Sequence, residues 1–150
     1  MRRRLEFARA LVGWPKIMLL DEATAGLDPI NAQAMIDLVI RARDVHQIST
    51  LFVTKEIHEI PYLDTHRAVK SATGQICIDA TSKSDELSGE AIAQIKVMVL
   101  DEGRAVFLGN AAEFGSSDLP QVSELIHPAS SAPSTGSYVQ DPWAHKRKQL

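Results

Sequence analysis

Hydrophobic positions in the first part of the chain switch between a helical spacing and a short continuous run. In residues 2–12 the apolar side chains recur three and four positions apart, with arginines on the other face. These apolar side chains are Leu5, Ala8, Leu11 and Val12. The spacing predicts an amphipathic helix that buries those four residues and ends at Gly13 and Pro15. Residues 17–20 are apolar on both faces, which is typical of a strand buried inside a parallel sheet.

A second helix and a second strand are predicted next along the chain. Asp28 is a favourable N-cap, and Pro29 suits the first helical position because the N–H that proline lacks has no partner there. The helix is expected to fade at residues 44–46, and its inner stripe is Met35, Leu38, Val39 and Ala42. Residues 49–54 form the next predicted strand, and residues 56–63 a short helix. The order strand, helix, strand predicts a parallel α/β sheet with a right-handed crossover.

The rest of the chain is less regular. Residues 70–95 are small and polar without a sustained period, which predicts an extended loop or insertion with one short strand at residues 75–78. Two apolar runs flank Asp-Glu-Gly within residues 96–108, and this pattern predicts a β-hairpin. The last part is rich in Ser, Pro, Ala and Gly, which predicts a disordered tail. We therefore expect one domain over residues 1–127 and a tail over residues 128–150.

Composition narrows the class of protein. The 150 residues are 45% hydrophobic and 23% charged, the balance of an ordinary globular domain, and the formal net charge of −3 does not favour nucleic acid as a partner. The single cysteine, Cys77, excludes an internal disulfide and fits a reducing cytosol. No apolar run reaches the roughly 18–20 residues that span a membrane, and we expect no signal peptide. A function at a membrane would therefore need another subunit to span it.

The first predicted strand ends in two carboxylates, Asp21 and Glu22. In open α/β sheets, ligands bind at the carboxyl edge of the strands. Phosphoryl transfer needs a carboxylate that helps to hold Mg²⁺ and a group that orients the attacking water. Asp21 suits the first role and Glu22, as a general base, suits the second. Taken alone, the pattern more often marks a strand that simply ends at the solvent.

The residues around this pair resemble motifs of ABC-type ATPases. Residues 21–29, Asp-Glu-Ala-Thr-Ala-Gly-Leu-Asp-Pro, resemble the Walker B and D-loop segment, with Ala23 where the family usually has Pro. Residues 2–11, Arg-Arg-Arg-Leu-Glu-Phe-Ala-Arg-Ala-Leu, resemble the helix that follows the ABC signature sequence. The spacing between the two segments also matches the family. Together these motifs outweigh the plainer interpretation of the two carboxylates.

The resemblance implies the second half of a RecA-like P-loop nucleotide-binding domain, with ATP and Mg²⁺ as cofactors. It implies that Asp21 helps to hold Mg²⁺, that Glu22 activates water, and that Asp28 lies in the D-loop at a dimer seam. Arg2, at the start of the signature helix, would lie near a phosphate of ATP on the opposite subunit, although a solvated basic face explains it equally well. The implied partners are a second nucleotide-binding domain and a transmembrane permease. The implied location is the cytoplasm, at the inner face of the cell membrane.

Two departures from the family limit this interpretation. Lys55 stands where the family places a His that contacts the γ-phosphate, and a lysine cannot act as a neutral imidazole acceptor. Lys55 is therefore either a tolerated phosphate contact or a sign of slow hydrolysis; His58 is a less favoured substitute, because we expect it to be an exposed helical histidine. The sequence has no Gly-x-x-x-x-Gly-Lys-Ser/Thr loop, and residues 109–117 have the wrong spacing and no Lys. The phosphate loop, the glutamine loop and the signature Ser-Gly-Gly are expected before Met1.

Three functions stay open at this stage. The segment after the two carboxylates resembles that of import-type and lipid-transport ATPases, and the Arg-rich helix is similar to that of Mce-associated, phospholipid-transporting ATPases; an exporter ATPase is the alternative transporter. A non-transport ABC ATPase of the chromosome-maintenance or repair kind also has these motifs late in its chain. The third is a non-catalytic, truncated remnant, and without a phosphate loop we expect these 150 residues alone to be inactive.

Overall fold

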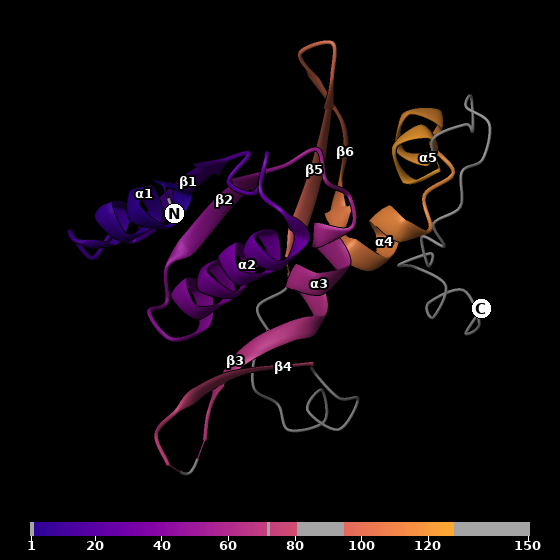
Figure 1. The fold of residues 1–150 in the computed structure, drawn as a ribbon. Coiled ribbons are helices and arrows are strands. Elements are labelled where there is room, and N and C mark those ends of the chain that lie inside the picture. Colours follow the sequence, from indigo (N-terminus) through magenta and orange to yellow (C-terminus); the bar gives the residue numbers. More distant parts are fainter. Residues whose placement is uncertain (1, 72, 81–94, 128–150) are drawn as a thin grey trace. The chain divides into compact units, whose positions relative to one another are not determined.

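A computed structural model describes residues 2–71, 73–80 and 95–127, which form a mixed α/β structure (Figure 1). The helices are α1 (Arg2–Leu11), α2 (Pro29–Asp44), α3 (Glu59–Thr65), α4 (Ala111–Gly115) and α5 (Pro120–Ile126). The strands are β1 (Ile17–Asp21), β2 (Ser49–Val53), β3 (His66–Lys70), β4 (Ile76–Ala80), β5 (Lys96–Asp101) and β6 (Arg104–Asn110). They pair as three two-stranded sheets, β1–β2, β3–β4 and β5–β6. The described residues form two compact units, the first with residues 2–59 and 65–80 and the second with residues 60–64 and 95–127.

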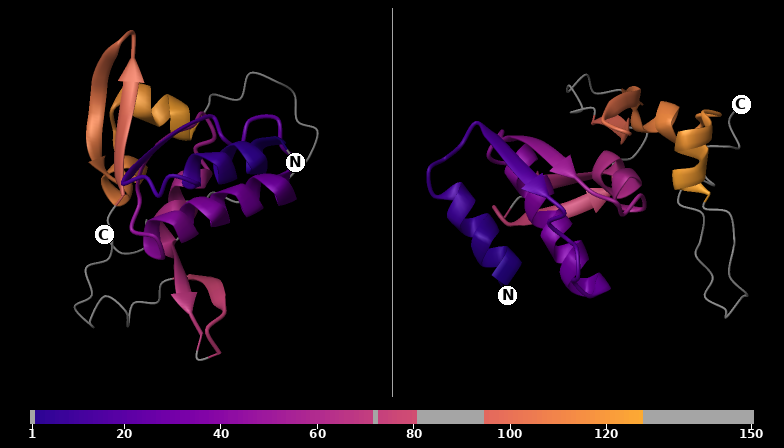
Figure 2. Two further views of the ribbon diagram at one scale, coloured as in Figure 1. Left: turned by 90° about the vertical axis from the view of Figure 1, so that its left-hand side faces the viewer. Right: turned by 90° about the horizontal axis from the view of Figure 1, so that it is seen from above.

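The first unit is built on the parallel pair β1–β2, which confirms the predicted strand–helix–strand order. The intervening helix α2 runs along one face of the pair (Figures 1 and 2) and contacts β2. Asp28 is the N-cap of α2, as predicted, and its carboxylate accepts the backbone N–H of Asn31 at 3.1 Å. Of the predicted inner stripe, Leu38 is only half-buried. The fully buried residues of α2 are Met35, Ile36, Val39, Ile40 and Ala42.

The helix α1 lies where the sequence predicts it, but its predicted inner face is wrong. Leu5 is exposed, and Val12, just beyond the helix, is 79% exposed, whereas Phe7 is buried. Phe7 shares with Met35 of α2 a hollow beside β1. An aromatic ring buries more apolar surface than the aliphatic side chains of the predicted stripe, and this favours the orientation that the helix takes.

The strands β1 and β2 are not buried on both faces, which corrects a second prediction. Met18 is buried on one face, but on the other Leu19 is 72% exposed and its register partner Leu51 is 61% exposed. Ile17 and Val53 extend the exposed apolar surface on this side. All four side chains are exposed, so this face of the pair meets solvent.

The segment predicted as an extended loop contains a strand. β4 overlaps the short strand predicted at residues 75–78 and pairs antiparallel with β3, which the sequence did not predict. The end of α2 anchors β3, because Asp44 accepts the N–H of Ala68 at 2.8 Å and Arg43 donates to the carbonyl of His66 at 2.7 Å. Residues 81–94, the rest of the expected insertion, lie outside the described residues.

The second unit contains the predicted hairpin β5–β6. Glu102 and Gly103 both have positive φ, as a two-residue hairpin turn requires. The segment that lacks phosphate-loop spacing forms the end of β6 and the short helix α4, and a capping box between Asn110 and Glu113 starts that helix. Buried side chains on β5 and on both helices form the core: Val97, Val99, Ala111, Phe114 and Val122. The sequence did not predict α4 or α5, and the predicted tail at residues 128–150 lies outside the described residues.

Candidate functional site

The carboxyl ends of β1 and β2 bring three of the predicted site residues together. Because the two strands are parallel, Asp21 at the end of β1 pairs in register with Val53 at the end of β2. The next residue, Glu22, donates its N–H to the carbonyl of Val53 at 2.8 Å, which extends the pairing by one residue. Lys55 follows β2 by two residues, so both carboxylates and the lysine lie at one edge of the pair.

The backbone at Glu22 adopts an unusual conformation. Its φ is +44°, in the left-handed region that side chains other than glycine rarely adopt. Such a conformation costs on the order of 1–3 kcal/mol and persists where the surroundings enforce it, often at functional sites. Here the N–H of Glu22 is bound to Val53, and its carbonyl accepts the N–H of Ala25 at 3.1 Å. Glu22 is therefore fixed at the point where the chain leaves the strand and turns.

Lys55 forms an ion pair with Glu22, with 2.7 Å between Nζ and Oε1. The hydrogen bond to Glu22 and the attraction of its charge raise the pKa of Lys55 above the ordinary 10.5, and the charge of Asp21 adds to the rise. The lysine side chain is 85% exposed, and exposed ion pairs contribute little to stability. The ion pair is therefore significant for its position, because it holds the Lys55 ammonium against Glu22, the predicted general base.

The segment that presents Lys55 is closed by contacts that the sequence interpretation missed. Thr54 accepts the N–H of Glu56 at 2.9 Å and donates its hydroxyl hydrogen to the Glu59 carboxylate at 2.7 Å. Glu59 is buried, although it was predicted only as part of a short helix. A glutamate among the apolar residues that follow a strand-ending threonine is the one signal in the sequence for this arrangement.

The other predicted site residues are not part of this cluster. The Asp28 carboxylate accepts from both the side chain and the backbone of Asn31, and these bonds lower its pKa below the ordinary 3.8. The side chain of Arg2 lies outside the described part of the structure. His58 is exposed, as predicted, but it precedes α3 instead of lying in a helix, and its Nδ1 is 3.6 Å from the carboxylate of Glu56.

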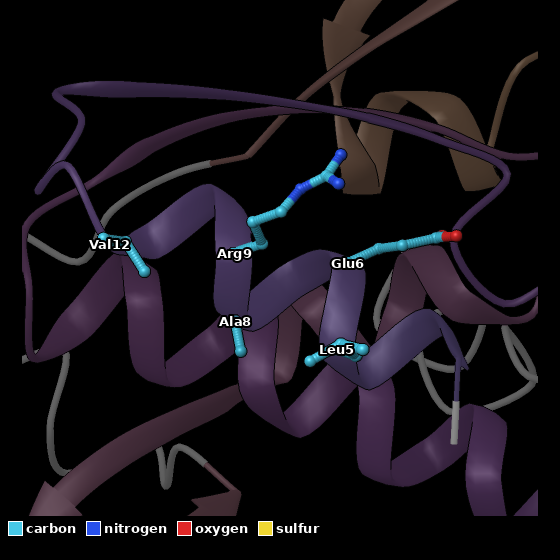
Figure 3. Close-up of a pocket in the computed structure, with 5 residues that line it drawn as sticks. All are labelled: Leu5, Glu6, Ala8, Arg9 and Val12. Atoms are coloured by element: carbon cyan, nitrogen blue, oxygen red, sulfur yellow. The ribbon is translucent and has the colours of Figure 1, made fainter.

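Two hollows among the described residues of the first unit lack the form of a nucleotide pocket. One, of about 190 Å³, is lined in part by Arg3, Asp21 and Met35, and it is smaller than the roughly 300–1,000 Å³ of typical ligand pockets. The other is an open hollow over α1 (Figure 3). Its lining residues are Leu5, Glu6, Ala8, Arg9 and Val12. Within the described residues, the carboxylate edge of β1 is therefore a surface and not an enclosed cavity.

The donor set at this edge suits the protein's share of a Mg²⁺ site. Mg²⁺ usually takes one or two protein carboxylates and completes its octahedron with water and substrate phosphates. Asp21 is exposed at the end of β1 and can supply such a carboxylate. The described part of the chain has no group of three or more His, Cys, Asp or Glu side chains that could hold a metal ion by itself. Asp21 therefore fits a metal that arrives with a phosphate ligand.

The sequence is similar to those of several curated bacterial proteins. It is 33% identical over 96 residues to the phosphonates import ATP-binding protein PhnC of Rhizobium johnstonii, a match that covers 63% of this chain and 32% of the relative. It is 36% identical over 59 residues to the methionine import ATP-binding protein MetN 2 of Staphylococcus epidermidis, covering 39% and 17%. It is 32% identical over 144 residues to MetN of Halalkalibacterium halodurans, covering 83% and 40%.

These matches cover much of this chain but a smaller share of each relative. The chain spans about a third of the phosphonate relative and two fifths of the longest methionine match. No family model and no solved structure matches the chain. None of the described helices has the length and apolar character needed to cross a bilayer. The chain is a homologue of ABC transporter ATP-binding proteins over part of their length, the family that its motifs predicted.

Proposed function

We propose that this chain forms the hydrolytic part of an ATP site in an ABC-type ATPase that drives an import-type transporter. The observation that carries the proposal is the edge of the β1–β2 pair, where Asp21 and Glu22 meet Lys55. This is the chemistry that phosphoryl transfer requires, a carboxylate for the metal and a second group for the attacking water. The names of the relatives, which refer to import of phosphonates and of methionine, support the transport class.

Each residue at the edge has a distinct part in the proposed reaction. Asp21 would contribute an oxygen ligand to Mg²⁺, which neutralises phosphate charge when it is bound. Glu22 would orient the attacking water and accept its proton as the water oxygen bonds to the γ-phosphorus and ADP departs. Lys55 holds Oε1 of Glu22, so the proposal assigns Oε2 to the water. Lys55 would also place positive charge beside the γ-phosphate, where the family has a His.

The remaining phosphate contacts would come from the phosphate loop expected before Met1 and from a partner subunit. We propose a second nucleotide-binding domain as one partner, with Asp28 at the seam and Arg2 near a phosphate. A transmembrane permease is the proposed second partner, which would place the protein in the cytoplasm at the inner face of the membrane. The support for both is the motif resemblance and the class of the relatives.

Phospholipid is the proposed class of cargo, on the basis of the Arg-rich helix and of the segment after the two carboxylates, which resembles that of import-type and lipid-transport ATPases. The names of the relatives refer to phosphonates and methionine, and these cargoes belong to the relatives. The test is ATP hydrolysis by the assembled transporter in detergent micelles free of phospholipid, to which each candidate cargo is added. Stimulation by phospholipid is expected, whereas stimulation by methionine or a phosphonate alone would contradict this part of the proposal.

A segment replacement tests the hydrolytic role. We would exchange the matching segment of the Halalkalibacterium halodurans methionine import ATP-binding protein for this chain and measure MgATP hydrolysis. Glu22→Gln is expected to lower turnover by about 10²–10⁴-fold, the usual contribution of a general base. Glu102→Gln, the same change in the exposed turn between β5 and β6, is the matched control and should leave turnover unchanged. Turnover that survives Glu22→Gln would contradict the proposal.

The isolated chain provides a second comparison. Without a phosphate-loop sequence it is expected to show no MgATP turnover by itself. Turnover of the isolated chain that Glu22→Gln abolishes would disprove this expectation, and with it the interpretation of the chain as a non-catalytic remnant.

Lys55→His in the segment replacement tests the role of the lysine in hydrolysis. Because the family uses a His at this position, the variant is expected to keep or raise the rate of ATP hydrolysis. A large loss of rate would mean that Lys55 has a role that an imidazole cannot perform.

A further inference from the structure

The geometry points to Glu59 as a positioning residue that, through Thr54, holds the segment after β2 so that Lys55 reaches Glu22. The inference rests on the proposed function, in which Glu22 activates water, and adds two residues that act on Glu22 only through Lys55. We name the Thr54–Glu59 hydrogen bond, together with the bond from Glu56 to Thr54, the clasp.

The hydroxyl of Thr54 both accepts and donates a hydrogen bond within the clasp. As an acceptor it takes the N–H of Glu56 at 2.9 Å, and as a donor it binds Oε2 of Glu59 at 2.7 Å. A threonine hydroxyl has one hydrogen to donate, so the bond to Glu59 fixes its direction. The N–H of Glu59 also binds the carbonyl of Glu56 at 3.0 Å. Thr54, Glu56 and Glu59 are thus joined in a closed ring of three hydrogen bonds, and Lys55 lies in the chain between two of its members, Thr54 and Glu56.

The burial of Glu59 shows that the clasp is a specific arrangement. Its side chain is 1% exposed, and Oε1 has no hydrogen-bond partner among the described residues. Burying a carboxylate is unfavourable unless its hydrogen bonds compensate, and an apolar residue of similar size would pack at this position without that cost. Among the described residues, the Glu59 carboxylate accepts a hydrogen bond from Thr54, and an apolar side chain could not form that bond.

The fixed ring explains why an exposed lysine occupies one position. Lysine has a flexible four-carbon stem. The free energy of an exposed ion pair is about as small as the conformational entropy cost of holding that stem in one conformation, so the pair alone does not fix it. The start of the segment is fixed because Val53 is hydrogen-bonded to Glu22, and the clasp fixes its end. With both ends held, the backbone of Lys55 lies where its ammonium can bind Oε1 of Glu22 at 2.7 Å. Loss of the clasp should therefore release Lys55.

The test is competitive labelling of lysine amines with acetic anhydride on the folded chain, with the extent at each lysine measured by mass spectrometry. Lys16, which is exposed, is the internal reference. Glu22→Gln removes the partner and should raise labelling of Lys55 by about 1.5- to 5-fold, the range that an exposed ion pair supplies. Glu59→Met keeps the buried volume but removes the clasp, and it should raise Lys55 labelling to the same level. Thr54→Ser keeps the hydroxyl and should retain the wild-type labelling.

A purely structural role for Glu59 predicts a different result. In that case Glu59→Met would change the melting temperature while the labelling of Lys55 stayed as in the wild type, and the inference would be overturned. Loss of the folded circular dichroism signal in Glu59→Met would also overturn it, because the clasp would then hold the fold instead of the segment. Unchanged Lys55 labelling in Glu22→Gln would show that the ion pair is absent. None of these measurements uses ATP, so failure of the proposed function in the turnover assay is a separate outcome.

Discussion

The two faces of the β1–β2 pair are alike in sequence and different in the structure. The helix α2 runs along one face of the pair (Figure 2), and Met18, which alternates with the exposed Leu19 along β1, is buried. On the opposite face, which we name the open face, Leu19 and Leu51 lie side by side in register and are mostly exposed, with Ile17 and Val53 beside them. Parallel strands in α/β proteins are normally covered on both faces. Here the described elements cover only one.

The difference shows what an apolar run can and cannot predict. An apolar side chain at every position of a strand indicates that either face can be buried, but the element that covers a face is encoded elsewhere. For the face of Met18 that element is α2, whose amphipathic spacing is visible a few residues along the chain. For the open face no such element occurs within the described residues. A contiguous apolar surface of this kind is typical of a site that associates with other protein surface.

The covered side is expected to give the largest effect. Ile40 of α2 is fully buried, with 0% exposure, whereas Ile30 in the first turn of the same helix is 82% exposed. Ile40→Ala removes buried methyl groups and leaves a cavity, so it should lower the free energy of unfolding by about 2–5 kcal/mol. Ile30→Ala, the matched control, should change it by less than about 0.5 kcal/mol. Urea unfolding followed by circular dichroism measures both, and equal effects would refute the assignment of α2's inner face.

The open face is expected to govern association instead of stability. Leu19→Thr together with Leu51→Thr places β-branched residues, which favour strands, at both positions and removes apolar surface that is already exposed. Each change should alter the free energy of unfolding by at most about 0.5 kcal/mol. Self-association measured by sedimentation velocity and binding of a hydrophobic dye should both decrease. The same change at the exposed Leu125 of α5 is the control and should affect neither.

A destabilisation of the double variant as large as that of Ile40→Ala would contradict this comparison. It would mean that the open face is packed in solution, and the two faces would then be equivalent in the way that the sequence predicted.

The sequence predicted those parts of the fold whose cause is local. The Asp28–Pro29 start of α2, the paired runs of β1 and β2, and the Glu102–Gly103 turn each follow from a few adjacent residues. It also placed Asp21, Glu22 and Lys55 at strand ends, and parallel pairing is enough to bring such residues to one edge.

The sequence did not predict features that depend on contacts between distant elements. Phe7 is buried on α1 in place of the predicted stripe because of what lies beside that helix, which its own periodicity does not contain. β3 forms from a polar segment because Asp44 binds it from 24 positions away. The Thr54–Glu59 bond likewise joins residues whose spacing matches no standard helix or strand pattern.

Substitutions of Asp28 test whether the packing of α2 on the β1–β2 pair depends on the start of that helix. They should destabilise the fold less than Ile40→Ala does. Asp28→Ala removes the N-cap bond to Asn31, so the helix should lose part of its first turn and the melting temperature should fall. Asp28→Ser, which keeps an accepting oxygen, is the matched control and should remain close to the wild type. Equal melting temperatures for Asp28→Ala and the wild type would show that packing of the inner stripe alone determines α2.

The same residue makes a prediction about pH. The bonds from Asn31 lower the pKa of Asp28 in the folded state, so its contribution is fully present above the ordinary value of 3.8. The contribution should be lost as pH falls from 3.8 through the lower folded value. Asp28→Asn can still accept the N–H but does not titrate, and the difference between the two melting curves in this acid range should shrink as pH falls.

The smallest effect is expected at Lys55, which lies at the end of the pair and on neither face. Its pKa is raised in the folded state, so the stability that the Glu22 pair contributes is fully present below 10.5 and is lost as pH rises through the higher folded value. Lys55→Gln should therefore lower the melting temperature slightly at neutral pH and low salt, and salt should diminish the difference because the pair is exposed. Lys16→Gln, an exposed lysine before β1, is the control for loss of one positive charge. If Lys55→Gln lowered the melting temperature as much as Asp28→Ala and did so equally in high salt, Lys55 would belong to the packed side of the pair, and the distinction between a covered face and an exposed carboxylate edge would not hold.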